Sequence, residues 1–493
     1  MKKLWKMKWL LAVVLVMGLL LTACGKEEEK ESKVDKYVQL EQEENAFLIF
    51  YDPSAEALLQ SFREHHPNIE IDIQKIDYIE EDGLVLKDMI ETYGPPDLIL
   101  GGAGEYAGVY FEVPEDICDL PRCYEQGYIA DLRTFCANDA SIDSNAYFPG
   151  TFEVFQNKNH LYALPLGISM DFLLTTDSKY DNSAFSELED GYNGRELMNV
   201  LLKEVEEKRE FDEFFCPEDV PGIRLLYQLG GVTETEAGIQ VDEEIFKKVY
   251  EYTYMNNKKA GDAKIVWAEE GKSFSVDNGF VQRTAFEPRA YEGKFIASFW
   301  VSMDAPAIAL SYATTANQYH VDEGTKAIYI PNYDDGNAYT AAVRVYGAVG
   351  AESKRQELAY ELLRLLMDEE ISYFKIHDDA IYNVFGFSAS YNLYPVNKER
   401  ALELLDGFES KNAMMLYGHQ GQGRYMQILD IVPVSEEEKV KHENMLNGIS
   451  GMTYLDEETR EASSLIWEYQ YMEIEDYKQC YDKVVKALNT WHE

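Results

Sequence analysis

The chain has 493 residues and a formal charge of −44 at pH 7, with 89 acidic residues against 45 lysines and arginines. So negative a surface repels nucleic-acid phosphates, which argues against a nucleic-acid partner. A hydrophobic content of 46% argues against disorder, and the length predicts two lobes rather than one compact domain.

The N-terminus has the pattern of a secretion signal. Lysines at positions 2, 3, 6 and 8 precede an apolar run from Trp9 to Leu21, and small residues follow. The run is shorter than the roughly 20 residues that span a bilayer, which disfavours the alternative of an uncleaved membrane anchor. The segment from Leu21 to Cys24 resembles a bacterial lipobox. This resemblance implies a signal peptide over residues 1–23 and a lipoprotein with diacylglycerol and palmitate on Cys24.

A charged segment leads from the lipid-bearing cysteine to the folded body. Residues 24–44 contain Tyr37 as their only aromatic residue, which predicts a flexible tether. The apolar run over residues 46–50 predicts the first buried strand. Ser54 can cap a following helix, whose apolar stripe consists of Ala55, Leu58, Leu59 and Phe62.

Strands and helices alternate beyond this helix. Alternating isoleucines over residues 69–73 predict a second strand, a helical pattern reaches Tyr93, and residues 96–100 predict a third strand. This alternation is typical of a parallel sheet covered by helices. Ligands bind beyond the carboxyl ends of such strands. The residues there are Tyr51, Asp52, Glu105 and Tyr106.

The rest of the chain predicts further elements with less regular spacing. Residues 173–294 have a mostly helical pattern, and strand patterns return at 295–300 and 327–331. A strong helix follows Ser353, and one or two helices close the chain over residues 463–492.

Besides Cys24, the chain has five cysteines and no CxxC pair, so the spacing gives no zinc-binding pattern. Cys118 and Cys123 flank Pro121 and can close a small disulfide loop outside the cell. Buried thiols are an equally good interpretation. The disulfide state stays open for all five cysteines: Cys118, Cys123, Cys136, Cys216 and Cys480.

No catalytic motif is complete. A zinc-protease helix needs a histidine four residues after His442, where Leu446 stands. A phosphate loop ending in Gly271-Lys272-Ser273 needs a glycine at Val266. Among 89 acidic residues, a carboxylate pair at glycosidase spacing indicates nothing. We therefore expect no catalytic residue, no metal site, no cofactor and no enzyme activity.

Seven segments in order carry a family resemblance: residues 62–69, 96–100, 127–132, 161–165, 293–300, 347–367 and 394–396. They resemble the extracellular solute-binding proteins of ATP-binding cassette (ABC) transporters, family 1, the sugar-binding group that includes maltose-binding protein. The resemblance implies an α/β fold of two lobes, each a helix-covered mostly parallel sheet, with a ligand cleft between them. The segments at 161, 347 and 394 would cross between the lobes. Residues 180–292 show no such resemblance, so no ligand contact is inferred there.

The resemblance also implies a division of the chain and a set of ligand contacts. Lobe I would take residues 45–165 plus 346–392, and lobe II residues 166–345 plus 393–493. The expected ligand-binding residues are Tyr51, Asp52, Glu105, Tyr106, Ser169, Asp171, Trp300, Asp304, Arg344 and Tyr346.

Several of these residues have structural alternatives. Trp300 can be a core anchor instead of a sugar platform, and Asp52 can cap the first helix. Arg344 can form an interlobe salt bridge, which we favour over a ligand contact. For Glu105 and Tyr106, a ligand contact and a purely structural role are equally good interpretations.

The resemblance implies a lipid-anchored receptor of an ABC importer on the outer face of a bacterial cytoplasmic membrane. Its expected partners are a mono- or oligosaccharide and the permease subunits of the transporter. Aromatic platforms with polar partners suit sugars, because sugars present apolar faces and rings of hydroxyl groups. The alternatives are an exported carbohydrate-active enzyme and a binding protein for a peptide or a polyamine.

Overall fold

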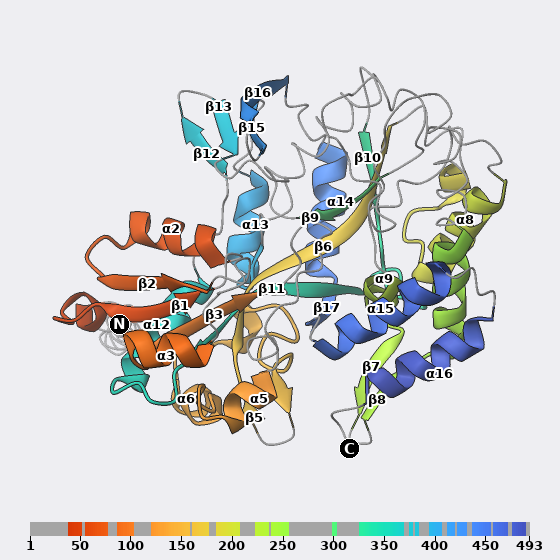
Figure 1. Cartoon of the computed structure of the whole chain (residues 1–493). Coiled ribbons are helices and arrows are strands. Elements are labelled where there is room, and N and C mark those ends of the chain that lie inside the picture. Colours follow the sequence, from red (N-terminus) through yellow and green to blue (C-terminus); the bar gives the residue numbers. More distant parts are fainter. Residues whose placement is uncertain are drawn as a thin grey trace, which may run out of the picture.

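The computed structural model of the chain (Figure 1) describes part of the sequence, and the statements below concern only that part. The signal peptide, Cys24 and the predicted tether up to residue 37 lie outside it. The described residues are 38–51, 55–76, 86–102, 120–157, 160–176, 184–207, 222–235, 238–255, 298–302, 325–368, 374–377, 380–383, 394–406, 412–419, 422–430, 436–454, 457–471 and 476–489.

A mixed sheet runs through the molecule, with the path β10-β6-β11-β3-β1-β2 and three further strands paired to its middle. Strands β14 and β9 pair with β6, and β17 pairs with β11. Within the described part of the chain this sheet has nine strands: β1 (Phe47–Tyr51), β2 (Ile71–Lys75), β3 (Leu98–Gly102), β6 (Leu164–Thr176), β9 (Ser298–Ser302), β10 (Thr325–Tyr329), β11 (Tyr339–Val349), β14 (Tyr394–Pro395) and β17 (Ile449–Thr453).

The N-terminal unit has the predicted alternation of strands and helices. Strands β1, β2 and β3 are parallel, and helices α2 (Glu56–His65) and α3 (Leu86–Tyr93) connect them. The predicted apolar stripe of the first helix is buried at all four positions. The N-cap position is occupied by Ala55, which makes no side-chain capping bond. Ser54 lies outside the described residues, so its expected capping role stays a prediction.

Two long strands connect the two sides of the molecule. Strand β6 has 13 residues, a span of roughly 40 Å at 3.3 Å per residue. Its first half pairs with β11, and its second half pairs with β9 and β10. Figure 1 shows β6 and β11 running from the group around β1 to the group of helices on the opposite side.

Two hydrophobic cores lie at the two ends of these strands. The first core surrounds β1, β3 and α12 (Gln356–Met367), and the second packs helices from the middle and the end of the chain. Strand β10 contributes to both: Tyr329 belongs to the first core and its neighbours Ile328 and Ile330 to the second. Because successive side chains of a strand point to opposite faces, β10 lies between the cores. The second core includes the helical residues 243–255 and the helices α8 (Gly194–Glu207), α9 (Gly222–Gln228), α15 (Glu457–Tyr471) and α16 (Tyr477–Ala487).

The remaining elements lie around this frame. Strands β12, β13, β15 and β16 form a separate sheet and are hydrogen-bonded in that order. Two hairpins, β4-β5 and β7-β8, lie apart from the larger sheets. The bounds are α5 (Leu120–Glu125), α6 (Arg133–Asn138), η2 (Ser144–Ala146), β4 (Gln156–Asn157), β5 (His160–Leu161), η3 (Ala184–Glu187), β7 (Val232–Thr235), β8 (Gly238–Val241), β12 (Phe374–His377), β13 (Ala380–Asn383), α13 (Lys398–Asp406), β15 (Asn412–His419), β16 (Gln422–Asp430) and α14 (Glu436–Asn447).

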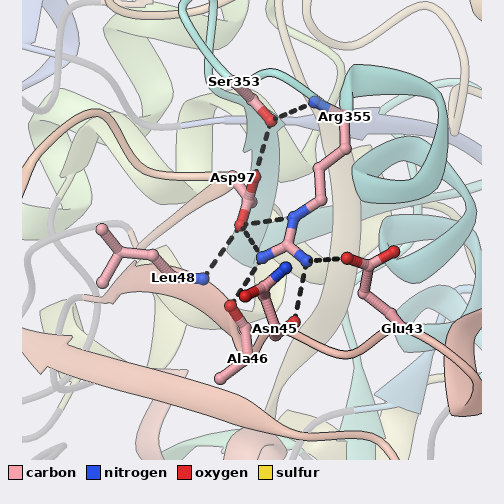
Figure 2. A network of polar contacts seen from close by, with 7 residues as sticks. All are labelled: Glu43, Asn45, Ala46, Leu48, Asp97, Ser353 and Arg355. Atoms are coloured by element: carbon pink, nitrogen blue, oxygen red, sulfur yellow. Dashed lines mark hydrogen bonds and ion pairs between the residues drawn. The ribbon is translucent and has the colours of Figure 1, made fainter.

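A polar network fastens the start of β1 to the start of α12 (Figure 2). Oδ2 of Asp97 accepts hydrogen bonds from the Leu48 amide at 3.0 Å and from Nη2 of Arg355 at 2.8 Å. Arg355 also pairs with Glu43 at 3.0 Å, so the first described residues are tied to the body. The network lies at the amino ends of β1 and β3, away from the edge where a parallel sheet binds ligands. The other contributors are Asn45, Ala46 and Ser353.

The predicted elements are confirmed at most positions where the structure describes the chain. The strands expected at 295–300 and 327–331 are β9 and β10, and the closing helices are α15 and α16. The helical pattern expected from residue 173 onward is wrong at its start, since β6 continues to Thr176, and wrong again at the β7-β8 hairpin. The division of the chain into two lobes stays a prediction. The first core also contains Ala401 and Met445, which belong to the segment assigned to lobe II.

Candidate functional site

The carboxyl ends of β1 and β3 meet at one edge of the sheet. Tyr51 ends β1, and its Cα pairs with Leu100 two residues before the end of β3. The Tyr51 side chain is 7% exposed, so most of its ring packs inside the molecule. Asp52, Glu105 and Tyr106 lie outside the described residues, and their place in a ligand site stays a prediction.

The two long strands pair irregularly where they pass each other. On β11, Val343 pairs with Ile168 and Val345 with Gly167, so Arg344 is an extra residue without a partner position on β6. A bulge of this kind redirects a side chain. Nε of Arg344 donates a hydrogen bond to Oγ of Ser169 at 2.8 Å, and Ser169 is fully buried. The structure therefore brings these two predicted site residues together.

A second arginine lies close to this pair. Arg224 belongs to α9, which packs against β11, and is 5% exposed. Burial lowers the pKa of the Arg224 guanidinium well below its usual range, and the positive charge of Arg344 lowers it further. One helical turn later, the buried Oε1 of Gln228 has no hydrogen-bond partner among the described residues. Buried polar groups of α9, β6 and β11 therefore lie close together here.

Tyr346 lies in a cluster of three aromatic rings. Its ring centroid is 5.4 Å from that of Phe155 and 5.5 Å from that of Tyr454, and Phe155 and Tyr454 are 5.0 Å apart. The cluster packs on β3, where a Cβ added to Gly101 would lie 2.2 Å from the Tyr346 ring. Only glycine, which lacks a Cβ, leaves room for the Tyr346 ring at this position. Tyr346 is 1% exposed, and its expected contact with ligand stays a prediction.

Strand β9 places Trp300 beside the second half of β6. The Cα of Trp300 pairs with Phe172, and Val301 pairs with Asp171. The backbone thus brings the predicted positions 171 and 300 onto neighbouring strands. Their side chains and Asp304 lie outside what the structure describes, so their roles stay predictions.

The third crossing segment joins the same strand. Tyr394 of β14 pairs with Ile168 of β6, and Ile168 in turn pairs with Val343 of β11. The three segments expected to cross between lobes therefore lie side by side in one sheet. We call this meeting point of β6, β11 and β14 the crossing.

A buried histidine links the third segment to β10. The Tyr394 hydroxyl is within hydrogen-bonding distance of Nε2 of His442, and the Tyr329 hydroxyl lies 3.2 Å from Nδ1. His442 is 1% exposed, and burial lowers its pKa to about 3. The imidazole is therefore neutral, with one nitrogen donating and the other accepting.

The other end of β14 is held by a second polar group. Nδ2 of Asn397 donates to Oδ1 of Asp368 at 3.0 Å, and Nη2 of Arg364 donates to the Tyr147 hydroxyl at 2.9 Å. The Tyr147 hydroxyl also donates to Asp368. Burial raises the pKa of Tyr147 to about 12, although the charge of Arg364 opposes the rise. Polar contacts thus fix both ends of the third crossing segment, buried at Tyr394 and partly buried at Asn397.

Three residues of this region have no signal in the sequence pattern: Arg224, His442 and Tyr454. Arg224 lies on a short helix in the segment without family resemblance, and the sequence around His442 shows only half of a zinc motif. Tyr454 follows an unpredicted strand. Each acquires its neighbours through contacts between segments far apart in the sequence.

The described residues form neither a metal site nor a membrane-spanning helix. No group of three histidine, cysteine, aspartate or glutamate side chains is placed to hold a metal ion there. No helix in the described ranges is long and apolar enough to cross a membrane. Cys136 and Cys480 have free thiols, and Cys123 is buried. The predicted alternative of a Cys118–Cys123 disulfide stays open, because Cys118 lies outside the described residues.

No protein-family model and no curated protein matches the chain. Among solved structures, it is similar to a family 1 extracellular solute-binding protein from Alicyclobacillus acidocaldarius, with 12% identity, a TM-score of 0.50, and coverage of 91% of this chain and 98% of the other. It is also similar to the sugar-binding protein MalE from Xanthomonas citri, with 11% identity, a TM-score of 0.50 and the same coverage. At these identities the likeness shows the fold alone. The chain has the two-lobed α/β fold of the extracellular solute-binding proteins.

Proposed function

We propose that the protein is a membrane-tethered, extracytoplasmic receptor that captures a carbohydrate between two lobes and delivers it to the permease of an ABC importer. The observation that carries this proposal is the crossing, where three separate chain segments pair side by side. A few strands that join two bodies form a hinge, and a ligand that contacts both bodies stabilises the closed state.

The fold supports a binding role. The two structures compared above are described as a solute-binding protein and a sugar-binding protein. The resemblance of seven sequence segments to the same group is independent of the fold comparison. Together they favour a receptor over an exported carbohydrate-active enzyme.

The chemistry of the crossing supports a sugar as the ligand. A sugar site needs aromatic faces for the apolar side of the ring and polar groups for each hydroxyl. Tyr346 and Tyr454 bring aromatic rings to the carboxyl end of β3, and Ser169 and Arg344 bring hydroxyl and guanidinium groups to the neighbouring strands.

The lipid anchor is supported by the sequence. A basic start, a short apolar run and the lipobox-like residues before Cys24 favour export and lipidation. Two acyl chains of a diacylglycerol would hold the protein at the membrane surface, because a single chain binds only marginally. A charged tether over residues 24–44 would then let the body move relative to the lipid.

The test is a binding screen on the purified mature protein without its lipid. Thermal shifts are measured with neutral oligosaccharides such as maltotriose, xylotriose and mannotriose, with peptides of three to five residues, and with spermidine and putrescine. A ligand that binds only the folded protein raises its melting temperature by mass action. We expect a shift with a saccharide. A shift with peptides or polyamines alone contradicts the carbohydrate assignment.

Two further measurements separate a receptor from an enzyme. Small-angle scattering should show a smaller radius of gyration at saturating saccharide, since closure brings the lobes together. Identical scattering profiles at saturation argue against closure. Release of the chromophore from nitrophenyl glycosides by the purified protein would favour the enzyme alternative.

A further inference from the structure

Tyr454 occupies a distinctive place at the edge of the sheet. It directly follows β17, and the last residue of that strand, Thr453, pairs with Ala342 of β11. Ala342 in turn pairs with Ser169 of β6. The chain therefore delivers Tyr454 to the crossing, beside the bulge that carries Arg344.

The Tyr454 side chain extends from the crossing to the end of β3. Its hydroxyl donates a hydrogen bond to the carbonyl oxygen of Gly102 at 3.4 Å. Gly102 is the last residue of β3, a central strand of the parallel unit. Ligands of such sheets lie beyond this edge. The tyrosine thus bridges the crossing and the edge at which a ligand is expected.

The rings behind Tyr454 hold it in one orientation. Tyr346 packs against it at an interplanar angle of 88° and Phe155 at 61°, both as edge-to-face contacts. Tyr346 and Phe155 are buried, at 1% and 6% exposure, whereas Tyr454 is half-buried. Tyr454 is therefore the outermost ring of the cluster. A ring fixed in advance loses little conformational freedom when a ligand packs on it.

We propose that Tyr454 is a ligand-contacting residue, whose ring is a stacking platform for a sugar ring at the carboxyl end of β3. The proposal rests on the carbohydrate-binding function proposed above. Tyr346 and Phe155 are buried behind this ring and hold it in position.

The test compares variants of this ring in calorimetric titrations with the saccharide that gives the largest thermal shift in the screen. Tyr454→Leu removes the platform and should weaken binding about tenfold or more, as expected for an anchoring aromatic residue. Tyr454→Phe keeps the platform and should weaken binding less. The matched control is Tyr93→Leu, because Tyr93 is 46% exposed on α3 and also packs edge-to-face on a phenylalanine, Phe50. Its affinity should equal that of the wild type.

A second measurement uses the wild-type protein and does not depend on how a variant folds. Nitration of tyrosines by tetranitromethane is mapped by mass spectrometry with and without saturating saccharide. The saccharide should slow nitration of Tyr454 and leave Tyr93 unchanged. Unchanged nitration of Tyr454, or a folded Tyr454→Leu protein with wild-type affinity, overturns the platform while the receptor function stands. If the wild type binds no saccharide, both proposals fail.

Discussion

The hydroxyl of Tyr394 and Nε2 of His442 are hydrogen-bonded in the interior, joining the third crossing segment to helix α14. The opposite ring nitrogen of His442 lies 3.2 Å from the hydroxyl of Tyr329 on β10. A protonated imidazole has two donors and no acceptor, so this pair of contacts requires a neutral histidine if one tyrosine is to donate. A structural contact at the crossing therefore depends on the charge state of one side chain.

Stability should fall on mild acidification because of His442. Its pKa is about 3 in the folded protein, against 6.5 for the free side chain. A depressed pKa means that the unfolded state binds the proton first, so the stability from this group is present above pH 6.5 and is lost as the pH falls toward 3. Between pH 7 and pH 5 the free energy of unfolding should decrease by roughly 2 kcal/mol from this residue.

Urea unfolding at pH 7 and pH 5 measures this effect. The comparison protein is His442→Gln, which retains a donor and an acceptor but does not titrate in this range. The variant should lose stability at pH 7 and should show a smaller decrease between the two pH values than the wild type. Equal decreases in both proteins contradict the assignment.

Asp97 should stabilise the first core through Arg355. Their side chains are 9% and 18% exposed, and the shortest contact between them is 2.8 Å. Removing one partner of a buried ion pair leaves a buried charge, so Asp97→Ala should lower the free energy of unfolding by about 3 kcal/mol. Glu403→Ala is the matched control, because its pair with Arg400 is 56–60% exposed and should contribute less than about 1 kcal/mol. Similar urea midpoints for the two variants would contradict the prediction.

The first part of the fold was predictable because its signals are local. The strand from Phe47 and the helix stripe at Leu58, Leu59 and Phe62 follow from spacing within a few residues. The stripe and every strand residue except Leu48 are buried. The parallel order of β1, β2 and β3 follows from the short helical connections between them. Local periodicity and tertiary packing agree in this segment.

The crossing was less predictable because it depends on the register between distant strands. Nothing near Arg344 in the sequence shows that it becomes the extra residue of a bulge beside Ser169, 175 positions away. The continuation of β6 to Thr176 depends on partners β9 and β10, which lie more than 120 residues later. His442 acquires its role only when Tyr329 and Tyr394 meet it from two other elements.

Lipidation at Cys24 predicts a change of location for a variant that lacks the thiol. Cys24→Ala should move the protein from the membrane fraction to the medium or leave it as an uncleaved precursor, because the acyl chains that retain it can no longer be attached. Fractionation and immunoblotting of the producing cells measure both outcomes. Cys136→Ala is the control and should stay in the membrane fraction, since Cys136 lies in the folded body. A processed Cys24→Ala protein that remains in the membrane contradicts the anchor.

Trp300 gives a sharp test of the carbohydrate assignment. It lies on β9 opposite Phe172 of β6, on the part of the sheet that continues beyond the crossing. An indole at this position can lie flat against a pyranose ring, as is also proposed for Tyr454. Trp300→Ala should then weaken saccharide binding by roughly 2 kcal/mol or more, the range of an anchoring residue. Calorimetric titration and urea unfolding are performed on the same variant.

The core alternative for Trp300 predicts a different pattern in these two measurements. Truncation of a buried tryptophan should lower the free energy of unfolding by about 3–5 kcal/mol. Phe299→Ala is the control, because adjacent residues of a strand point to opposite faces, so it should leave affinity unchanged. A stable Trp300→Ala protein with wild-type affinity removes Trp300 from the site. A large loss of stability places it in the core, and the sugar platform then depends on Tyr454.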